Sequence, residues 1–450
     1  MKRLLLIITV SVFLASNVSA QSAAEVILLN HKTLSKKAAA SDKQIKDEKK
    51  NIKSATWVKR GKIYQDIFTQ GLEQVQLGMG TTGMKVFYGD PLGEPEIDSN
   101  NVEIYKYETI NYYFEDGKMR AWTRNNAINE NPLDVSLKSY QKGIELTEAE
   151  KQIKAQEKIK GNLNDLKIQF QNSGQSNYFL GNHEAALKDF ESILEINKFP
   201  VFEGVVDTMM INFSGIVARE IGRLNNDESK YREAINYYKM LTELDYGGTN
   251  MYIQMTRDYY SIGDTLGAID NLKRGLKQYP DSTVLVTLTA QAYYLMKNNE
   301  GGIAFTDARM AEKPDCAEAY YWKGLLITNH DNLSQDTIDL ALELYKKAVE
   351  VDPTKATIWY QAGYVYYALG ANYFELEGYE ADADRRKVLI EKGDNNYENA
   401  VINLEKTYEI AGDELNLKSE SLELLKRIYY KLYGNEDERY LSTMERIKNL

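Results

Sequence analysis

The chain has 450 residues, of which 43% are hydrophobic and 27% are charged, and its 66 acidic side chains outnumber 55 basic ones, for a formal net charge of -11. This acidic balance makes nucleic acid and anionic lipid poor candidate partners. The single cysteine, Cys316, cannot form an internal disulfide, so we expect it to be buried and the fold to be stabilised by packing alone.

The first twenty residues have the pattern of a cleavable secretory signal. Lys2 and Arg3 precede an apolar run over 4–15, and a small-residue cleavage site ends at Ala20. The run is too short to span a bilayer as a helix, and no later segment is apolar enough to do so. We therefore expect a signal peptide over 1–20 that is cleaved after Ala20. Because no cysteine stands at the cleavage point, the pattern predicts a free periplasmic protein and not a lipoprotein.

The segment 21–69 predicts an N-terminal helical region. Its first part is rich in Ala, Lys, Glu and Gln, which is typical of a polar helix or a partly ordered arm. Trp57, Gly61 and Tyr64 then have the spacing that opens a tetratricopeptide repeat. This spacing indicates either half of such a repeat or a coincidence.

The segment 70–124 has a different texture and predicts a small α/β module. The runs Val102–Tyr107 and Ile110–Phe114 are rich in β-branched and aromatic residues, which favour strands. Asp116-Gly117 after the second run predicts a tight hairpin turn. The order of short helix, Gly-Asp-Pro and strands ending in Tyr-Phe-x-x-Gly-Lys-x-x-x-Trp loosely resembles the SmpA/OmlA domain of bacterial outer-membrane assembly, over this module only.

The segment 125–166 predicts a polar linker followed by a helix. Thr147 and Glu150 fit a capping box, in which the two side chains accept hydrogen bonds from amides at the start of a helix. We therefore expect a helix to begin at Thr147.

A repeat runs over 167–412. Small residues recur in pairs twelve positions apart, and Ala234, Ala268 and Gly302 lie 34 apart. Both spacings are similar to those of the tetratricopeptide-repeat (TPR) family, which implies helical hairpins stacked into a right-handed superhelix. The pairs with the twelve-residue spacing are Gly174 with Ala186, Gly222 with Ala234, Thr256 with Ala268, and Ala290 with Gly302.

The sequence thus predicts a mainly α protein: a TPR helical-hairpin solenoid of about six repeats, preceded by the small α/β module and followed by C-terminal capping helices over 413–450. Three insertions interrupt the period, near 197–213, 325–340 and 371–395. The last one separates Gly363 from Ala400 and contains no proline. We interpret it as a lengthened helical hairpin, with a mobile loop as the alternative.

Catalytic and metal-binding patterns are missing from the sequence. The three histidines, His31, His183 and His330, have no ligand spacing, and no phosphate-binding loop or nucleophile elbow occurs. We expect no metal, no cofactor and no enzymatic activity, and we expect His183 and His330 to lie at the surface.

The TPR resemblance implies that the first helices line a concave groove. Residues three before, one after and four after the small residue would point into it, and these slots are rich in tyrosine and arginine. Tyrosine gives amphipathic contact area and arginine binds carboxylates, so the slots favour a protein or peptide partner. The alternative is that the tyrosines only pack between neighbouring repeats. The predicted contact residues are Tyr178, Arg219, Arg223, Arg257, Tyr260, Tyr294, Tyr321, Tyr360, Tyr364 and Tyr367.

The sequence therefore favours a non-enzymatic periplasmic scaffold or adaptor that binds a protein partner in its groove, for example within an envelope assembly or secretion complex. A second hypothesis is glycan binding, because aromatic faces also stack on sugars. An enzyme remains as a third, in which the module over 70–124 holds an unrecognised site.

Overall fold

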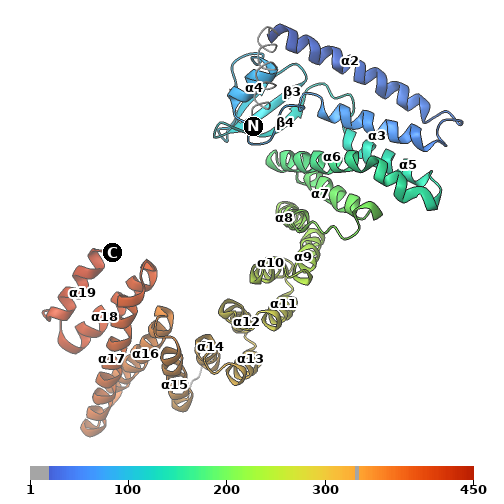
Figure 1. The fold of residues 1–450 in the computed structure, drawn as a ribbon. Coiled ribbons are helices and arrows are strands. Elements are labelled where there is room, and N and C mark those ends of the chain that lie inside the picture. Colours follow the sequence, from blue (N-terminus) through green and yellow to red (C-terminus); the bar gives the residue numbers. More distant parts are fainter. Residues whose placement is uncertain (1–19, 330–333) are drawn as a thin grey trace, which may run out of the picture. The chain divides into compact units, whose positions relative to one another are not determined.

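The computed structural model describes residues 20–329 and 334–450 (Figure 1), with side chains from Leu28 onward. The predicted signal over 1–20 falls almost wholly outside the described residues, as does His330. The chain divides into two compact units, Met1–Gly247 and Gly248–Leu450, and each is considered by itself. In the part that the structure describes, no helix has the length and apolar character needed to cross a membrane.

The described part of the N-terminal unit begins with two antiparallel helices, α2 (Ala20–Gln44) and α3 (Ser54–Thr69). Leu34 of α2 and Tyr64 of α3 belong to the small apolar core between them. Arg60, which stands where leucine is usual in a repeat, is 8% exposed and pairs with Asp42 at 2.6 Å. The arginine is tolerated there because α2 supplies its counter-ion.

The predicted small module is present. Helix α4 (Thr81–Tyr88) is followed by a four-stranded antiparallel sheet of order β1-β2-β3-β4. Asp116 and Gly117 join the last two strands with positive φ angles of 51° and 70°, which confirms the predicted hairpin turn. The strands are β1 (Glu96–Ile97), β2 (Glu103–Lys106), β3 (Ile110–Glu115) and β4 (Lys118–Arg124), and the core of the module includes Met84, Tyr112, Phe114 and Met119.

The module interrupts a helical hairpin, because α3 packs against α5 (Pro132–Glu145), which follows the module in the chain. A Cβ added to Gly61 of α3 would lie 2.6 Å from the ring of Tyr140, so only glycine allows this approach. Ser136 of α5 donates a hydrogen bond to the Gly61 carbonyl at 2.9 Å. Trp57, Gly61 and Tyr64 therefore open a real hairpin whose second helix is α5.

The same glycine–aromatic contact recurs in later hairpins. An added Cβ would lie 2.5 Å from Phe190 at Gly174 and 2.6 Å from Tyr345 at Gly324. The split hairpin of α3 and α5 is thus built like the hairpins that follow it, and it precedes the six repeats counted from the sequence.

The predicted helix start at Thr147 is wrong. A short 3-10 turn, Ala149–Lys151, precedes α6 (Gln152–Phe179), and no side chain caps either element. The Thr147 hydroxyl instead donates to the Gly143 carbonyl at 3.1 Å. The threonine hydroxyl therefore forms its hydrogen bond at the C-terminal end of α5, where the last carbonyls of the helix lack intrahelical partners.

The remaining helices form consecutive hairpins (Figure 1), and many begin at a capping side chain, as at Asp264, which accepts a hydrogen bond from the Gly267 amide at 2.8 Å. In the first unit the pairs are α6 (Gln152–Phe179) with α7 (His183–Asn197), and α8 (Thr208–Asn225) with α9 (Glu228–Glu243). In the second unit they are α10 (Thr249–Ser261) with α11 (Thr265–Gln278), α12 (Thr283–Leu295) with α13 (Asn299–Glu312), α14 (Ala317–Ile327) with α15 (Gln335–Val351), α16 (Ala356–Tyr379) with α17 (Ala383–Ile410), and α18 (Leu415–Tyr433) with α19 (Glu438–Lys448). The fold is mainly α with one small sheet, and Cys316 is buried, as predicted.

The pairing of α8 with α9 differs from the sequence prediction. Gly215, and not Gly222, lies against Tyr238, with an added Cβ 2.9 Å from its ring, whereas Gly222 faces Tyr231. The reason is the short connection through Asn226, whose left-handed φ of 52° lets α9 begin at Glu228. The groove positions of this hairpin therefore lie two helical turns earlier than predicted.

The insertion near 371–395 extends a helical hairpin, as predicted, since α16 continues to Tyr379 and α17 starts at Ala383. Close helix contacts run along the extension. An added Cβ at Gly370 would lie 2.4 Å from the ring of Tyr397, and one at Gly393 would lie 2.8 Å from the ring of Phe374.

Replacing Gly370 by alanine is expected to lower the free energy of unfolding by about 1–3 kcal/mol, because the methyl group has no room against Tyr397. The matched control is Gly378→Ala on the same helix, where nothing lies within 4 Å. There the better helix propensity should stabilise the hairpin by up to about 1 kcal/mol. Urea unfolding of both variants checks the contrast, and a stabilising Gly370→Ala would rule out the tight hairpin.

Candidate partner-binding site

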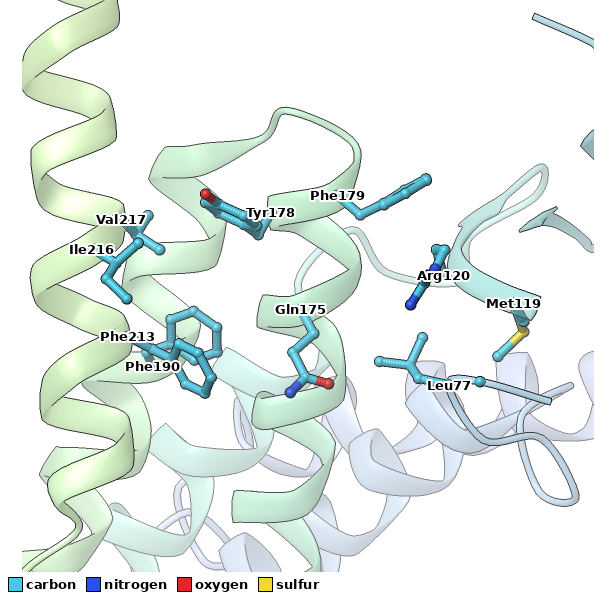
Figure 2. A pocket seen from close by; sticks show the side chains of 11 residues that line it. Leu77, Met119, Arg120, Gln175, Tyr178, Phe179, Phe190, Phe213, Ile216 and Val217 are labelled. Carbon is cyan, nitrogen blue, oxygen red and sulfur yellow. The ribbon is translucent and has the colours of Figure 1, made fainter. Parts of the chain in front are cut away.

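A cavity of about 670 Å³ lies within the N-terminal unit, between the small module and the first helices of two hairpins (Figure 2). Its volume falls in the range typical of ligand-binding pockets. Most of its lining is apolar. The lining residues are Leu77, Gly78, Met119, Arg120, Gln175, Tyr178, Phe179, Phe190, Phe213, Ile216 and Val217.

The helical wall of the cavity follows from the glycine positions. Gln175 and Tyr178 come one and four residues after Gly174 on α6, and Ile216 comes one residue after Gly215 on α8. Because the two glycines occupy equivalent places in their hairpins, these side chains project from the same face of each first helix (Figure 2). This is the face that the sequence predicts to bind a partner.

The floor of the cavity is aromatic. Phe190, which packs on Gly174, stacks with Phe213 of α8 at a centroid separation of 5.7 Å and an interplanar angle of 26°. Figure 2 shows the two rings side by side, with Ile216 and Val217 above them on α8. Phe190 is 2% exposed, so this part of the wall is held rigidly.

The module forms the opposite wall, where Leu77, Met119 and Arg120 lie across from α6 (Figure 2). Strand β4 is fixed to α6 by Ser176. The Trp122 amide donates to the Ser176 hydroxyl at 3.1 Å, and this hydroxyl lies 3.4 Å from the Trp122 carbonyl. The position of the module is therefore set by hydrogen bonds to the helix that carries the other wall.

Among the described residues, Arg120 is the only charged one that lines the cavity. Its Nε atom lies 3.2 Å from a carboxylate oxygen of Glu115, and both side chains are more than two-fifths exposed. Such an exposed pair contributes little to stability, so the guanidinium can exchange Glu115 for a carboxylate of a bound partner.

Of the predicted contact residues, Tyr178 lines this cavity, and it is 40% exposed. Its ring lies edge-on to the ring of His183, and His183 itself is half-buried. The guanidinium carbon of Arg219 lies 4.9 Å from the centroid of the Tyr238 ring. Arg223 donates a hydrogen bond to the carboxylate of Glu220 on the same helix. The register of α8 thus places Ile216 in the cavity and leaves Arg223 at an exposed end of the helix.

In the second unit, two predicted contact tyrosines, Tyr321 and Tyr294, are partly buried against other aromatic rings. Tyr321 packs between Trp322 and Tyr345, and burial raises its pKa. Tyr294 lies edge-on to Trp322 at 6.2 Å.

Two predicted contact tyrosines of α16, Tyr360 and Tyr367, pack against the helices that follow it in the chain. Tyr367 stacks on Tyr397 at 5.6 Å, and Tyr360 and Tyr367 both pack against the core that includes Leu425 of α18. Burial and a hydrogen bond to Glu420 of α18 raise the pKa of Tyr360. These residues support packing between neighbouring hairpins, whereas Arg257, Tyr260 and Tyr364 remain exposed.

Among the described residues, no three His, Cys, Asp or Glu side chains gather to hold a metal ion. The cavity of Figure 2 offers mostly apolar side chains, together with the guanidinium of Arg120 and the amide of Gln175, and such a lining suits binding.

The family model described as TPR repeat matches residues 333–370, and no curated protein matches the chain. Similar solved structures include a TPR repeats protein from Bacteroides fragilis, with 19% identity over 57% of this chain and 97% of that one and a TM-score of 0.33. MamA from Desulfovibrio magneticus has 18% identity over 44% of this chain and 97% of that one, with a TM-score of 0.26. A thermophilic TPR protein from Thermus thermophilus has 15% identity over 44% and 89%, with a TM-score of 0.30.

Proposed function

We propose that this chain, which is a tetratricopeptide-repeat protein, is a non-enzymatic scaffold that holds a protein or peptide partner against the first helices of its repeats, with the apolar cavity of Figure 2 as the principal contact. The observation that carries the proposal is the composition and rigidity of this cavity. TPR repeats as a class support protein–protein interaction.

The energetics favour a partner segment with an apolar anchor. Phe213, Ile216 and Tyr178 are only partly buried in the free chain, so covering them removes apolar surface from water at about 25 cal/mol per Å². The aromatic floor loses little conformational freedom when the segment enters, because its rings are already packed. An acidic group beside the anchor would reach Arg120.

We place this scaffold in the periplasm, within an envelope assembly or secretion complex. The support is the signal pattern at the N-terminus of the sequence, with its basic pair, apolar run and cleavage site at Ala20. Cell fractionation with sequencing of the mature N-terminus tests this proposal. A chain that retains its first twenty residues in the cytoplasm would overturn it.

We do not extend the proposal to glycans bound by the groove tyrosines. Tyr360 and Tyr367 pack against α18, and Tyr321 packs inside its own hairpin, so their faces are used within the fold. Among the predicted contact tyrosines that the structure describes in the second unit, only Tyr260 and Tyr364 have exposed rings.

The test is photocrosslinking in the cell. A photoreactive phenylalanine at Tyr178 should attach a defined protein, and the same group at Tyr430, which is 59% exposed on α18, should not attach it. Mass spectrometry then identifies the protein, and calorimetry with the purified pair measures its affinity. Equal labelling from both positions, or no labelling from Tyr178, would overturn the proposal.

A further inference from the structure

A second cavity, of about 410 Å³, lies in the N-terminal unit where α5 begins, bordered by β4, the loop over 125–131, α6 and α7. Its lining differs from that of the apolar cavity, because polar side chains gather around one aromatic wall. The lining includes Trp122, Asn129, Asp134, Asn177, Lys188 and Asp189.

Asp189 is the unusual group of this cavity. The residue is only 9% exposed, and its carboxylate accepts a hydrogen bond from Asn177 Nδ2 at 3.0 Å. No described lysine or arginine forms an ion pair with it. Burial raises its pKa to about 6, and hydrogen bonds from Ser173 and Asn177 and the nearby charge of Lys188 offset this effect only in part. The group is therefore charged at neutral pH without an ion pair of its own. A buried carboxylate in this state is costly, and a cation beside it would relieve the cost.

The other charged groups of the cavity are already engaged or acidic. Lys188 of α7 pairs with Asp134 of α5. Arg124 of β4 donates to the carbonyls of Phe68 and Gln70. Glu130 of the loop adds a further negative charge to the lining. The lining carries three acidic residues (Glu130, Asp134 and Asp189) and two basic ones (Arg124 and Lys188), so its net charge is negative and disfavours an anionic ligand.

We propose that this cavity binds an alkylguanidinium or alkylammonium group, such as the side chain of an arginine or lysine, with Asp189 as its counter-ion and Trp122 as the wall for its alkyl stem. The site is separate from the apolar cavity of Figure 2, and it does not depend on the function proposed for that cavity. A partner that carries an apolar anchor and a basic side chain would engage both.

This buried charge should also affect how the stability of the free protein depends on pH. Because the folded-state pKa of Asp189 is raised, its contribution to stability is complete below the unfolded-state value of about 4 and is lost as the pH rises through about 6. Asp189→Asn removes this loss and keeps an acceptor for Asn177. The variant is expected to have a higher Tm than the wild type at pH 7.5, and the difference should shrink towards pH 4.5. Thermal melts at the two pH values measure it.

The binding test uses two isosteric probes on the full chain, Nα-acetyl-argininamide and the neutral Nα-acetyl-citrullinamide. We expect calorimetry or NMR titration at pH 7.5 to show binding of the arginine probe, with the citrulline probe at least about tenfold weaker. Asp189→Asn should weaken the arginine probe by a similar factor, whereas Asp270→Asn, an exposed control on α11, should not. Binding should also fall as the pH drops below about 6, where Asp189 becomes protonated.

Three results would overturn the proposal: equal affinity for the two probes, no binding of the arginine probe at millimolar concentration, or binding that Asp189→Asn leaves unchanged. The comparison of the two probes on the wild-type protein does not depend on the folding of any variant. A variant of the apolar cavity, Ile216→Arg, should bind the arginine probe as the wild type does, which separates this site from partner capture.

Discussion

Replacing Tyr140 by alanine is expected to lower the free energy of unfolding of the N-terminal unit by about 3–5 kcal/mol. The ring is completely buried and fills the space left by Gly61, so its removal opens a cavity between α3 and α5. The hydroxyl also donates to the side chain of Gln65, whose own amide donates to the Asn162 carbonyl on α6 at 2.9 Å. The variant thus loses packing and one end of a bridge among three helices.

The measurement is the urea dependence of amide hydrogen exchange in α3 and α5, which reports on this unit by itself. Tyr140→Phe keeps the packing and should lose only about 1–3 kcal/mol through the unpaired Gln65 oxygen. Tyr430→Ala on α18, where the side chain is 59% exposed, should change stability by no more than about 0.5 kcal/mol. If Tyr140→Ala behaves like Tyr430→Ala, α3 and α5 do not form the closely packed hairpin described here.

Replacing Ile216 by arginine is expected to reduce affinity for the protein partner by at least about 30-fold, which corresponds to about 2 kcal/mol and to a binding hot spot. Ile216 lies in the middle of the α8 wall, and a guanidinium there would have to be desolvated against the apolar lining. Because the side chain is only partly buried in the free chain, the fold should tolerate the change. Calorimetry with the partner identified by crosslinking measures the effect.

Leu224→Arg is the matched control, since Leu224 is 52% exposed on the same helix and does not line the cavity. It adds the same charge to α8, so a general electrostatic effect would weaken both variants equally. Unchanged affinity in Ile216→Arg would place the partner elsewhere on the chain.

The fold could be predicted from the sequence because its signals are local. The small residues twelve apart mark close helix crossings, and the Asp116-Gly117 turn follows from the positive φ that both positions adopt. The split hairpin was harder to predict, because the partner of Gly61 is Tyr140, on the far side of the inserted module. Spacing rules apply to neighbours in the chain and cannot connect a helix to one that follows an insertion.

The candidate site was predicted less well. Tyr178 follows from its slot after Gly174, but Ile216 was missed because Gly222 and Ala234 have the usual spacing while Gly215 makes the contact with Tyr238. The length of the connection after α8 decides whether Gly215 or Gly222 packs against Tyr238. A rule based on a twelve-residue spacing does not take this length into account. The wall formed by Leu77 and Arg120 depends on how β4 docks on α6, which no pattern within the module indicates. Asp189 stands on an ordinary helix face in the sequence, and its burial and its hydrogen bond to Asn177 follow from the packing of α7 against α6.

The most direct test of the central claim is hydrogen–deuterium exchange of the full chain with and without the purified partner. The account predicts slower exchange at three places around the cavity of Figure 2: the middle of α8 near Ile216, the C-terminal turns of α6 near Tyr178, and the β3–β4 hairpin near Arg120. Protection confined to helices of the second unit, with exchange at these three places unchanged, would contradict it.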